Sequence, residues 1–235
     1  MRTMLLSDLM MTSNYLRRFF VLLVLCVAIA SFLMRNTPLV IVFGGSITPL
    51  ALLSTLVMYD DRNGWEAFRL ALPLSRRNIV FGRYATLAVV CLTSTALCAF
   101  IYLTASVAIQ YAPVLAQSAF RPEEFDSSAF TLCVASPLVF SFVLTGLILP
   151  LVARFGMTRS IRYILAAGMA GTTLLFNLRT MIDITPFMPL VRYLSSTVST
   201  LEGALTLSGA LLCISAAFYL ASAHIASRMY RKREF

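Results

Sequence analysis

YDDRNGWEAFRLALPLSRRNIVFGRY (residues 59–84) is a polar stretch between two long apolar runs of the chain. Trp65 and Phe68 lie among charged residues at its centre, which predicts a short helix with one apolar side. Pro73 ends this helix, and Ser75 is suited to cap the next one. We expect an amphipathic helix at the cytosolic face of a membrane, with an ordinary solvated loop as the alternative. Five arginines would orient this helix: Arg62, Arg69, Arg76, Arg77 and Arg83.

The composition of the whole chain indicates a membrane protein. Of its 235 residues, 59% are hydrophobic and 12% are charged, and the mean hydropathy is +0.85. A soluble domain would carry about a quarter charged residues. Long apolar blocks of this kind predict packed transmembrane helices, so the expected fold is an all-α integral membrane protein.

We expect six membrane spans in one domain that covers residues 19–235. The spans cover about 19–34, 39–58, 85–110, 129–149, 163–178 and 204–226. In the second span, Gly44 and Gly45 allow a close approach of neighbouring helices. In the fourth span, Pro137 predicts a kink, and Pro150 begins the basic segment that follows. The fifth span is the shortest prediction, but it is rich in small residues that favour helix contact in lipid.

Residues 1–18 predict an amphipathic interfacial helix ahead of the first span. Leu5, Leu9 and Leu16 fall on one side of this helix, and Asp8 and Ser13 fall on the opposite side. A signal peptide is the alternative, but the apolar core is not followed by a small-residue cleavage site. Before the last span, residues 179–203 predict a pair of short interfacial or re-entrant helices.

The charge distribution predicts the orientation in the membrane. The net charge of +9 comes from 19 basic and 10 acidic residues, and the basic residues gather at the ends of apolar runs. This placement is typical of cytosolic loops and not of a nucleic-acid-binding surface. We expect both termini and the loop 59–84 in the cytosol, and the chain in the cell membrane.

The sequence does not indicate a catalytic, metal or cofactor site. Its cysteines lie inside apolar runs without the spacing of metal ligands. Lys232 in the tail is the only lysine, so a phosphate-binding loop is excluded and any ATPase must be another chain. Ser46 and His224 could form the nucleophile and base of an intramembrane hydrolase, but we expect them at opposite ends of the membrane. The centres of the spans lack charged residues, which argues against an ion-coupled carrier.

Segment 59–84 resembles the first cytosolic loop of ABC type-2 exporter permeases. The resemblance lies in its acids, its aromatic helix, LPLSRR and the IVFGRY that opens the third span. LPLVARFGMTRSIRY (residues 149–163) resembles the second cytosolic loop of this family, and LLSDL near the N-terminus resembles its opening. The resemblance implies a six-span permease that pairs with a second permease chain, identical or not, and with a separate ATPase subunit.

By this resemblance, the helix in segment 59–84 is the coupling helix that docks on the ATPase. Arg76 and Arg77 could instead serve only to anchor the topology. The candidate coupling residues are Glu66, Phe68, Arg69, Leu72, Pro73, Arg76 and Arg77.

The predicted activity is export of a hydrophobic or amphipathic cargo, such as a peptide, an antibiotic or a lipid. The apolar spans with few polar groups suggest this class of cargo, and the resemblance alone suggests the direction. A membrane scaffold or immunity-type binding protein that does not transport is the alternative.

Overall fold

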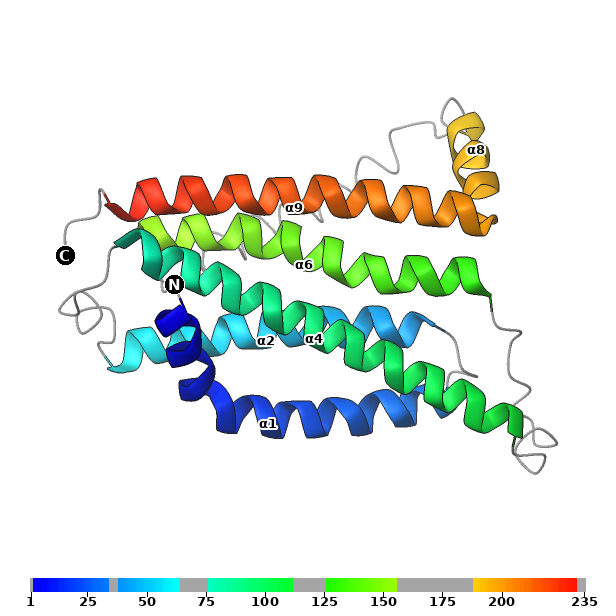
Figure 1. The fold of residues 1–235 in the computed structure, drawn as a ribbon, viewed down its shortest axis with the longest axis horizontal. Helices are drawn as coiled ribbons and strands as arrows, with labels where there is room; N and C mark the ends of the chain where they lie inside the picture. Colours follow the sequence, from blue (N-terminus) through cyan, green and yellow to red (C-terminus); the bar gives the residue numbers. More distant parts are fainter. Residues whose placement is uncertain (1, 34–37, 64–75, 112–125, 156–187, 232–235) are drawn as a thin grey trace, which may run out of the picture.

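Long helices that lie side by side form the body of the computed structural model (Figure 1). The structure describes residues 2–33, 38–63, 76–111, 126–155 and 188–231. Within these ranges the regular structure is entirely helical, as predicted. The helices are α1 Arg2–Leu33, α2 Leu39–Asn63, α4 Arg76–Tyr111, α6 Ser127–Phe155, α8 Met188–Val198 and α9 Leu201–Arg231.

Five of these helices are long and apolar enough to cross a membrane. Their apolar stretches are Thr12–Ser31, Leu39–Leu56, Arg77–Ala108, Ser127–Phe155 and Leu201–Tyr230. They correspond to five of the six predicted spans, which confirms the all-α membrane fold. The other predicted span, 163–178, lies outside the described residues, so the count of six stays a prediction.

Helix α6 is longer than the predicted fourth span, about 129–149, and continues through Pro150 to Phe155. A proline inside a helix has no N–H, so the carbonyl four residues earlier loses its helical partner. In α6 that carbonyl belongs to Gly146, and another helix supplies its hydrogen bond, as described below.

The first helix is continuous from Arg2 to Leu33, and its first turns are bent away from the rest (Figure 1). Ser13 is exposed, but Asp8 and Thr12 are fully buried, while Met10 is exposed. The polar residues therefore do not all lie on a water-facing side of this segment. The division into an interfacial helix at 1–18 and a membrane domain at 19–235 stays a prediction.

The predicted close approach at the glycine pair of α2 is confirmed. A Cβ atom on Gly44 would lie 2.7 Å from Cys98 Sγ of α4 and 3.0 Å from Val27 Cγ2 of α1. A Cβ atom on Gly45 would lie 2.9 Å from Pro137 Cβ of α6. Four helices therefore meet at this pair, and neither glycine leaves room for a side chain.

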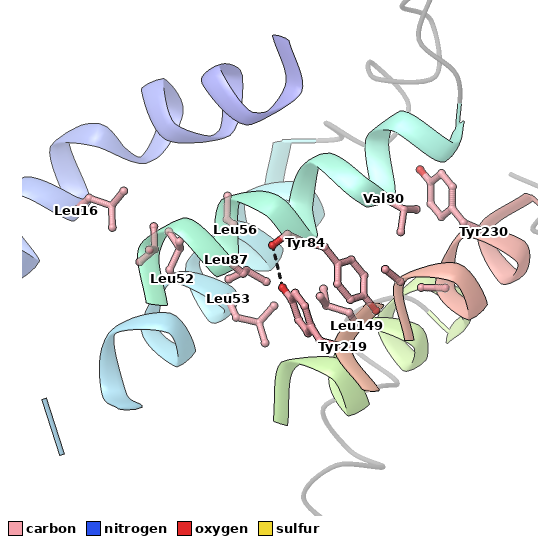
Figure 2. Close-up of a cluster of buried hydrophobic side chains, with 13 residues drawn as sticks. Leu16, Leu52, Leu53, Leu56, Val80, Tyr84, Leu87, Leu149, Tyr219 and Tyr230 are labelled. Carbon is pink, nitrogen blue, oxygen red and sulfur yellow. Dashed lines mark hydrogen bonds between the residues drawn. The ribbon is translucent and has the colours of Figure 1, made fainter. Parts of the chain in front are cut away.

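The main buried cluster joins the two sides of the bundle. On one side α6 and α9 pack along their lengths, and on the other α1 and α2 pack against α4 (Figure 1). Figure 2 shows leucines of α2 and α4 that point toward the aromatic side chains of α9. Members of this cluster include Leu52, Leu56, Leu87, Leu149 and Tyr219.

The two ends of the bundle differ in charge and in structure. We call the "basic end" the end at which α1 begins, α2 ends, α4 begins, and α6 and α9 end (Figure 1). Exposed arginines from four helices lie in these parts of the chain: Arg17, Arg18, Arg77, Arg154 and Arg228.

At the opposite end, the short helix α8 lies across the start of α9 (Figure 1). A Cβ atom on Gly203 would clash with the backbone oxygen of Thr197, so only glycine fits this corner. The structure thus contains one of the two short helices expected in 179–203.

Candidate functional site

The predicted coupling residues are only partly within the described structure. Glu66, Phe68, Arg69, Leu72 and Pro73 lie outside it. Arg76 is the first residue of α4, and the exposed Arg77 lies in the first turn of that helix. The described part of the site is therefore the place where segment 59–84 continues into α4 at the basic end, and the coupling role of these seven residues stays a prediction.

Aromatic contacts join the first turns of α4 to α9. The guanidinium carbon of Arg77 lies 5.3 Å from the ring centroid of Phe81, one turn later on the same helix face. The His224 ring of α9 meets the Phe81 ring edge-on, with 5.4 Å between the centroids and an interplanar angle of 88°. Phe81 thus links a predicted coupling residue to the last helix of the chain.

One turn deeper, hydrogen bonds connect three helices. The hydroxyl oxygen of Tyr84 in α4 lies 2.8 Å from Ser222 Oγ in α9. Ser222 Oγ in turn donates to the backbone oxygen of Gly146 in α6. Because a serine hydroxyl has one proton and a carbonyl can only accept, Tyr84 is the donor to Ser222. The bonds therefore run in one direction, from α4 through α9 to α6.

The position of Pro150 explains why Ser222 finds an acceptor on Gly146. Pro150 lies inside α6 and has no N–H to offer to the Gly146 carbonyl. An unsatisfied carbonyl is expensive in a membrane, where water does not compete for it. Ser222 supplies the missing donor from α9, so the Gly146 carbonyl is satisfied although α6 continues beyond Pro150.

A second hydrogen bond links α9 back to α4. The hydroxyl of Tyr219 donates to the backbone oxygen of Tyr84 over 2.8 Å (Figure 2). The rings of Tyr84 and Tyr219 lie 4.8 Å apart, and Phe142 of α6 stacks on Tyr219 at 5.1 Å. We call the bonded residues Tyr84, Gly146, Tyr219 and Ser222 the "tyrosine–serine network". All four are buried.

The candidate catalytic pair is not brought together. Gly45, the neighbour of Ser46, lies against Thr95 of α4, whereas His224 lies against Phe81 of the same helix. Phe81 and Thr95 are 14 residues apart, and this spacing corresponds to about 21 Å along a helix. The expected separation of Ser46 and His224 is confirmed, and the pair cannot act as nucleophile and base in this arrangement.

Two buried hydroxyls lie near the glycine pair. Thr95 of α4 is 2% exposed and Ser141 of α6 is 1% exposed. Neither hydroxyl oxygen makes a hydrogen bond of normal distance and angle within the described part of the chain. The Cys91 thiol lies beside both, and a thiol is only a weak hydrogen-bonding group. Polar groups left in this way are uncommon in protein interiors.

Comparison with known proteins identifies the family. A family model described as ABC-2 family transporter protein matches residues 3–231, which is nearly the whole chain. The chain belongs to the ABC-2 transporter family. The searches of curated proteins and of solved structures found no match.

As an ABC-2 family member, the chain is a multi-pass membrane permease of an ABC transporter. The family also implies association with an ABC ATPase subunit. The resemblance noted in the two loops is thereby confirmed over a much longer part of the sequence.

Sequence reasoning missed the tyrosine–serine network of this ABC-2 permease. Pro150 was a usable signal, because a proline four residues after Gly146 in an apolar run exposes a carbonyl that needs a donor. The donor itself could not be identified, since Ser222 is one of many hydroxyl residues in the spans. Tyr84 lies within the LPLSRRNIVFGRY motif, but the motif does not reveal its partner.

Proposed function

We propose that this permease forms the membrane path of an exporter whose ATP is bound and hydrolysed by a separate subunit that docks on segment 59–84. The single observation that carries the proposal is the position of this segment. Its two described ends, the end of α2 and the start of α4, lie at the basic end, where α1, α4, α6 and α9 have exposed arginines. Positive charge marks the cytosolic side of membrane proteins, which is where an ATPase has access to ATP.

The docking surface is assigned to Glu66, Phe68, Arg69, Leu72, Pro73, Arg76 and Arg77. An apolar side with flanking charges suits a groove on another protein. Both termini lie in the cytosol in this arrangement, and the protein resides in the cell membrane. ATP is bound by the partner ATPase, because the permease sequence holds a single lysine, Lys232, and lacks a phosphate-binding loop.

The outer faces of the bundle suit lipid and a second permease chain, identical or not. Val21, Leu22 and Leu25 of α1 are more than half exposed, and so are Leu205 and Leu220 of α9. Such apolar faces are stable only in hydrocarbon or against another membrane helix.

The cargo is assigned to the hydrophobic or amphipathic class, such as a peptide, an antibiotic or a lipid. Residues 90–108 of α4 and 127–153 of α6 contain no charged side chain. A path along these helices would not replace the hydration of an ionic solute. Transport of a hydrophilic, charged solute by the reconstituted complex would contradict this assignment.

The proposal is tested by expression of the permease with its neighbouring genes, followed by a search for an ATPase that co-purifies with it. Arg76→Glu and Arg77→Glu should each reduce the ATPase recovered, and Pro73→Gly combined with Arg76→Glu should abolish its recovery. Arg154→Glu is the matched control, because Arg154 is also exposed at the basic end but belongs to α6. Insertion and topology should stay normal in all four variants.

Two outcomes would contradict the proposal. Inverted topology in the Arg76→Glu variant would mean that the arginines only anchor the chain. A permease that purifies alone under all conditions would favour a scaffold or binding protein.

A further inference from the structure

We infer that Tyr84, Tyr219 and Ser222 are positioning residues of the transport cycle, which transmit movement of segment 59–84 from α4 to α6 and α9. This inference rests on the proposed function, since it describes what happens after the ATPase moves the segment. The tyrosine–serine network would make the basic-end parts of α4, α6 and α9 move as one body.

The first step concerns the connection between the segment and the network. Helix α4 is continuous from Arg76, and Tyr84 lies eight residues later. An unbroken helix rises about 1.5 Å per residue, so this distance is about 12 Å. Ile79 and Val80 are buried on the way and hold this part of α4 against its neighbours. A displacement at Arg76 is therefore carried to Tyr84 without an intervening loop.

The second step concerns the strength of the link between α6 and α9. Most hydroxyls in membrane helices can bond to a carbonyl one turn earlier in their own helix, as Thr86 does with Gly82 and Ser94 does with Cys91. Ser222 instead donates to Gly146 of another helix. Because Pro150 cannot supply an alternative donor, separation of α6 from α9 would leave the Gly146 carbonyl unsatisfied in lipid.

The third step concerns the link between α4 and α9. Tyr84 donates its hydroxyl proton to Ser222, and its backbone oxygen accepts the proton of Tyr219. The two bonds have opposite directions across the same pair of helices, so sliding or rotation of α4 against α9 would break both. Contacts of α2 with α1, α4 and α6 at Gly44 and Gly45 are instead van der Waals contacts. Such contacts resist separation but have no bond direction to fix the register.

The experiment has a stability part and a movement part, both on the full-length permease. In the stability part, thermal unfolding is measured for wild type, Ser222→Ala, Pro150→Ala and the double variant. Ser222→Ala should lower the unfolding midpoint by roughly 2–10 °C, because it leaves the buried Gly146 carbonyl without a hydrogen-bond donor. Alanine at position 150 restores an N–H for that carbonyl. Pro150→Ala should therefore raise the midpoint more in the Ser222→Ala background than in wild type.

Ser215→Ala is the matched control for this part. Ser215 is also buried in α9, but it donates to Leu212 of its own helix, so its removal strands no acceptor in α6. If Pro150→Ala changes the unfolding midpoint equally in wild type and in the Ser222→Ala variant, the inference is overturned, because Ser222 would then not satisfy the Gly146 carbonyl.

In the movement part, the Tyr84→Phe/Tyr219→Phe variant removes the two hydrogen bonds of the tyrosine–serine network between α4 and α9 and keeps both rings. The Ser222–Gly146 bond is unaffected, so the variant should remain folded. Spin labels are attached at Val89→Cys in α4 and Ile225→Cys in α9, which are exposed positions. Cys26, Cys133 and Cys213, the cysteines that are not buried, are replaced by serine.

In the complex with its ATPase, the wild-type distance between these labels should be the same with and without bound ATP. In the double tyrosine variant the distance should change or broaden when ATP binds. Tyr193→Phe, which removes an exposed hydroxyl in α8, should behave as wild type. A distance that stays fixed in the double tyrosine variant would overturn the inference, because other contacts would then hold α4 against α9.

Failure of the proposed function gives a different result. If wild type does not retain the ATPase, the proposal of a coupled permease fails at purification. In that case the width of the distribution of distances between the two labels, measured without nucleotide, still tests the network. Broadening in the double tyrosine variant supports the link, and an unchanged width overturns it.

Discussion

Ser222 of α9 donates a hydrogen bond to the carbonyl of Gly146 in α6, which is the carbonyl that Pro150 deprives of its helical donor. Pro150 thus leaves a carbonyl of α6 without its helical donor, and a hydroxyl of α9 donates to that carbonyl instead. Since Tyr84 donates to the same serine, α4 is joined to this contact as well. A local defect of the α6 backbone in this way produces the polar contact among three helices of the permease.

The glycine pair of α2 should not tolerate a methyl group. Gly45→Ala should lower the free energy of unfolding by about 1–3 kcal/mol, because the new Cβ would lie 2.9 Å from Pro137 and 3.0 Å from Thr95 Oγ1. Gly209→Ala in α9 is the control, since a Cβ there meets nothing within 4 Å. It should stabilise by about 0.5–1 kcal/mol through helix propensity. Equal effects of the two changes in thermal unfolding would refute close packing at Gly45.

The corner between α8 and α9 should depend on Gly203. An alanine Cβ would clash with the Thr197 backbone oxygen, and a backbone atom cannot move aside as a flexible side chain does. We expect Gly203→Ala to separate α8 from α9, with a rise in hydrogen exchange of the α8 amides. If the α8 amides exchange at the same rate in the Gly203→Ala and Gly209→Ala variants, the chain can form this corner without glycine at position 203.

The buried hydroxyls of Thr95 and Ser141, which lack a hydrogen bond of normal distance and angle within the described residues, should lower the free energy of unfolding. Thr95→Val and Ser141→Ala should each raise the free energy of unfolding by about 1 kcal/mol or more, because they remove a buried polar group that has no good partner. The controls are Thr86→Val and Ser94→Ala, whose hydroxyls are buried in α4 but bonded. These should be neutral or destabilising. Lower unfolding midpoints for both test variants would show that the Thr95 and Ser141 hydroxyls are satisfied in the membrane.

Asp126 should make the stability of α6 depend on pH. Its carboxylate accepts hydrogen bonds from the Ser128 hydroxyl at 2.7 Å and from the Ser128 N–H at 2.9 Å, so it caps the helix. The Ser128 hydroxyl, followed by the backbone N–H groups of Ser128 and Ala129, lowers the pKa of Asp126. A lowered pKa means that this contribution is complete above the unfolded value of about 3.9 and is lost as the pH falls through the folded value.

The measurement for Asp126 is the unfolding midpoint at pH 7 and at pH 3, compared with Asp126→Asn. Asparagine keeps the cap without titrating, so the variant should lose less stability at pH 3 than wild type does. The same loss in both proteins would mean that other carboxyl groups cause the pH dependence.

The membrane fold could be predicted because its determinants are local in the sequence. Apolar length and flanking arginines identify spans independently of what packs against them, and the small size of Gly44 and Gly45 indicates close contact without naming the neighbour. The donor to the Gly146 carbonyl of α6 could not be predicted, because the bond joins residues 76 positions apart. The burial of Asp8 was missed for a similar reason, since the bend and rotation of α1 decide which side faces the protein.

The long sequence separation of the bonded residues also explains why only part of the candidate site could be predicted. Arg76, Arg77 and the surrounding motif carry charge and helix-ending signals that can be recognised in the sequence. The side chains of Tyr84 and Ser222 each have one hydroxyl as their only hydrogen-bonding group. The partner of such a hydroxyl depends on how two helices are rotated against each other. No local pattern encodes that rotation.

The bond from Ser222 to Gly146 also has a consequence for biosynthesis. The ribosome makes Gly146 first and Ser222 76 residues later, which takes roughly 4–15 s at the usual rates of translation. During this interval α6 is in the membrane or the insertion machinery with a carbonyl that its own helix cannot satisfy. Arrival of α9 ends this state, so a nascent chain that stops before Ser222 should expose a defect that cellular quality control can detect.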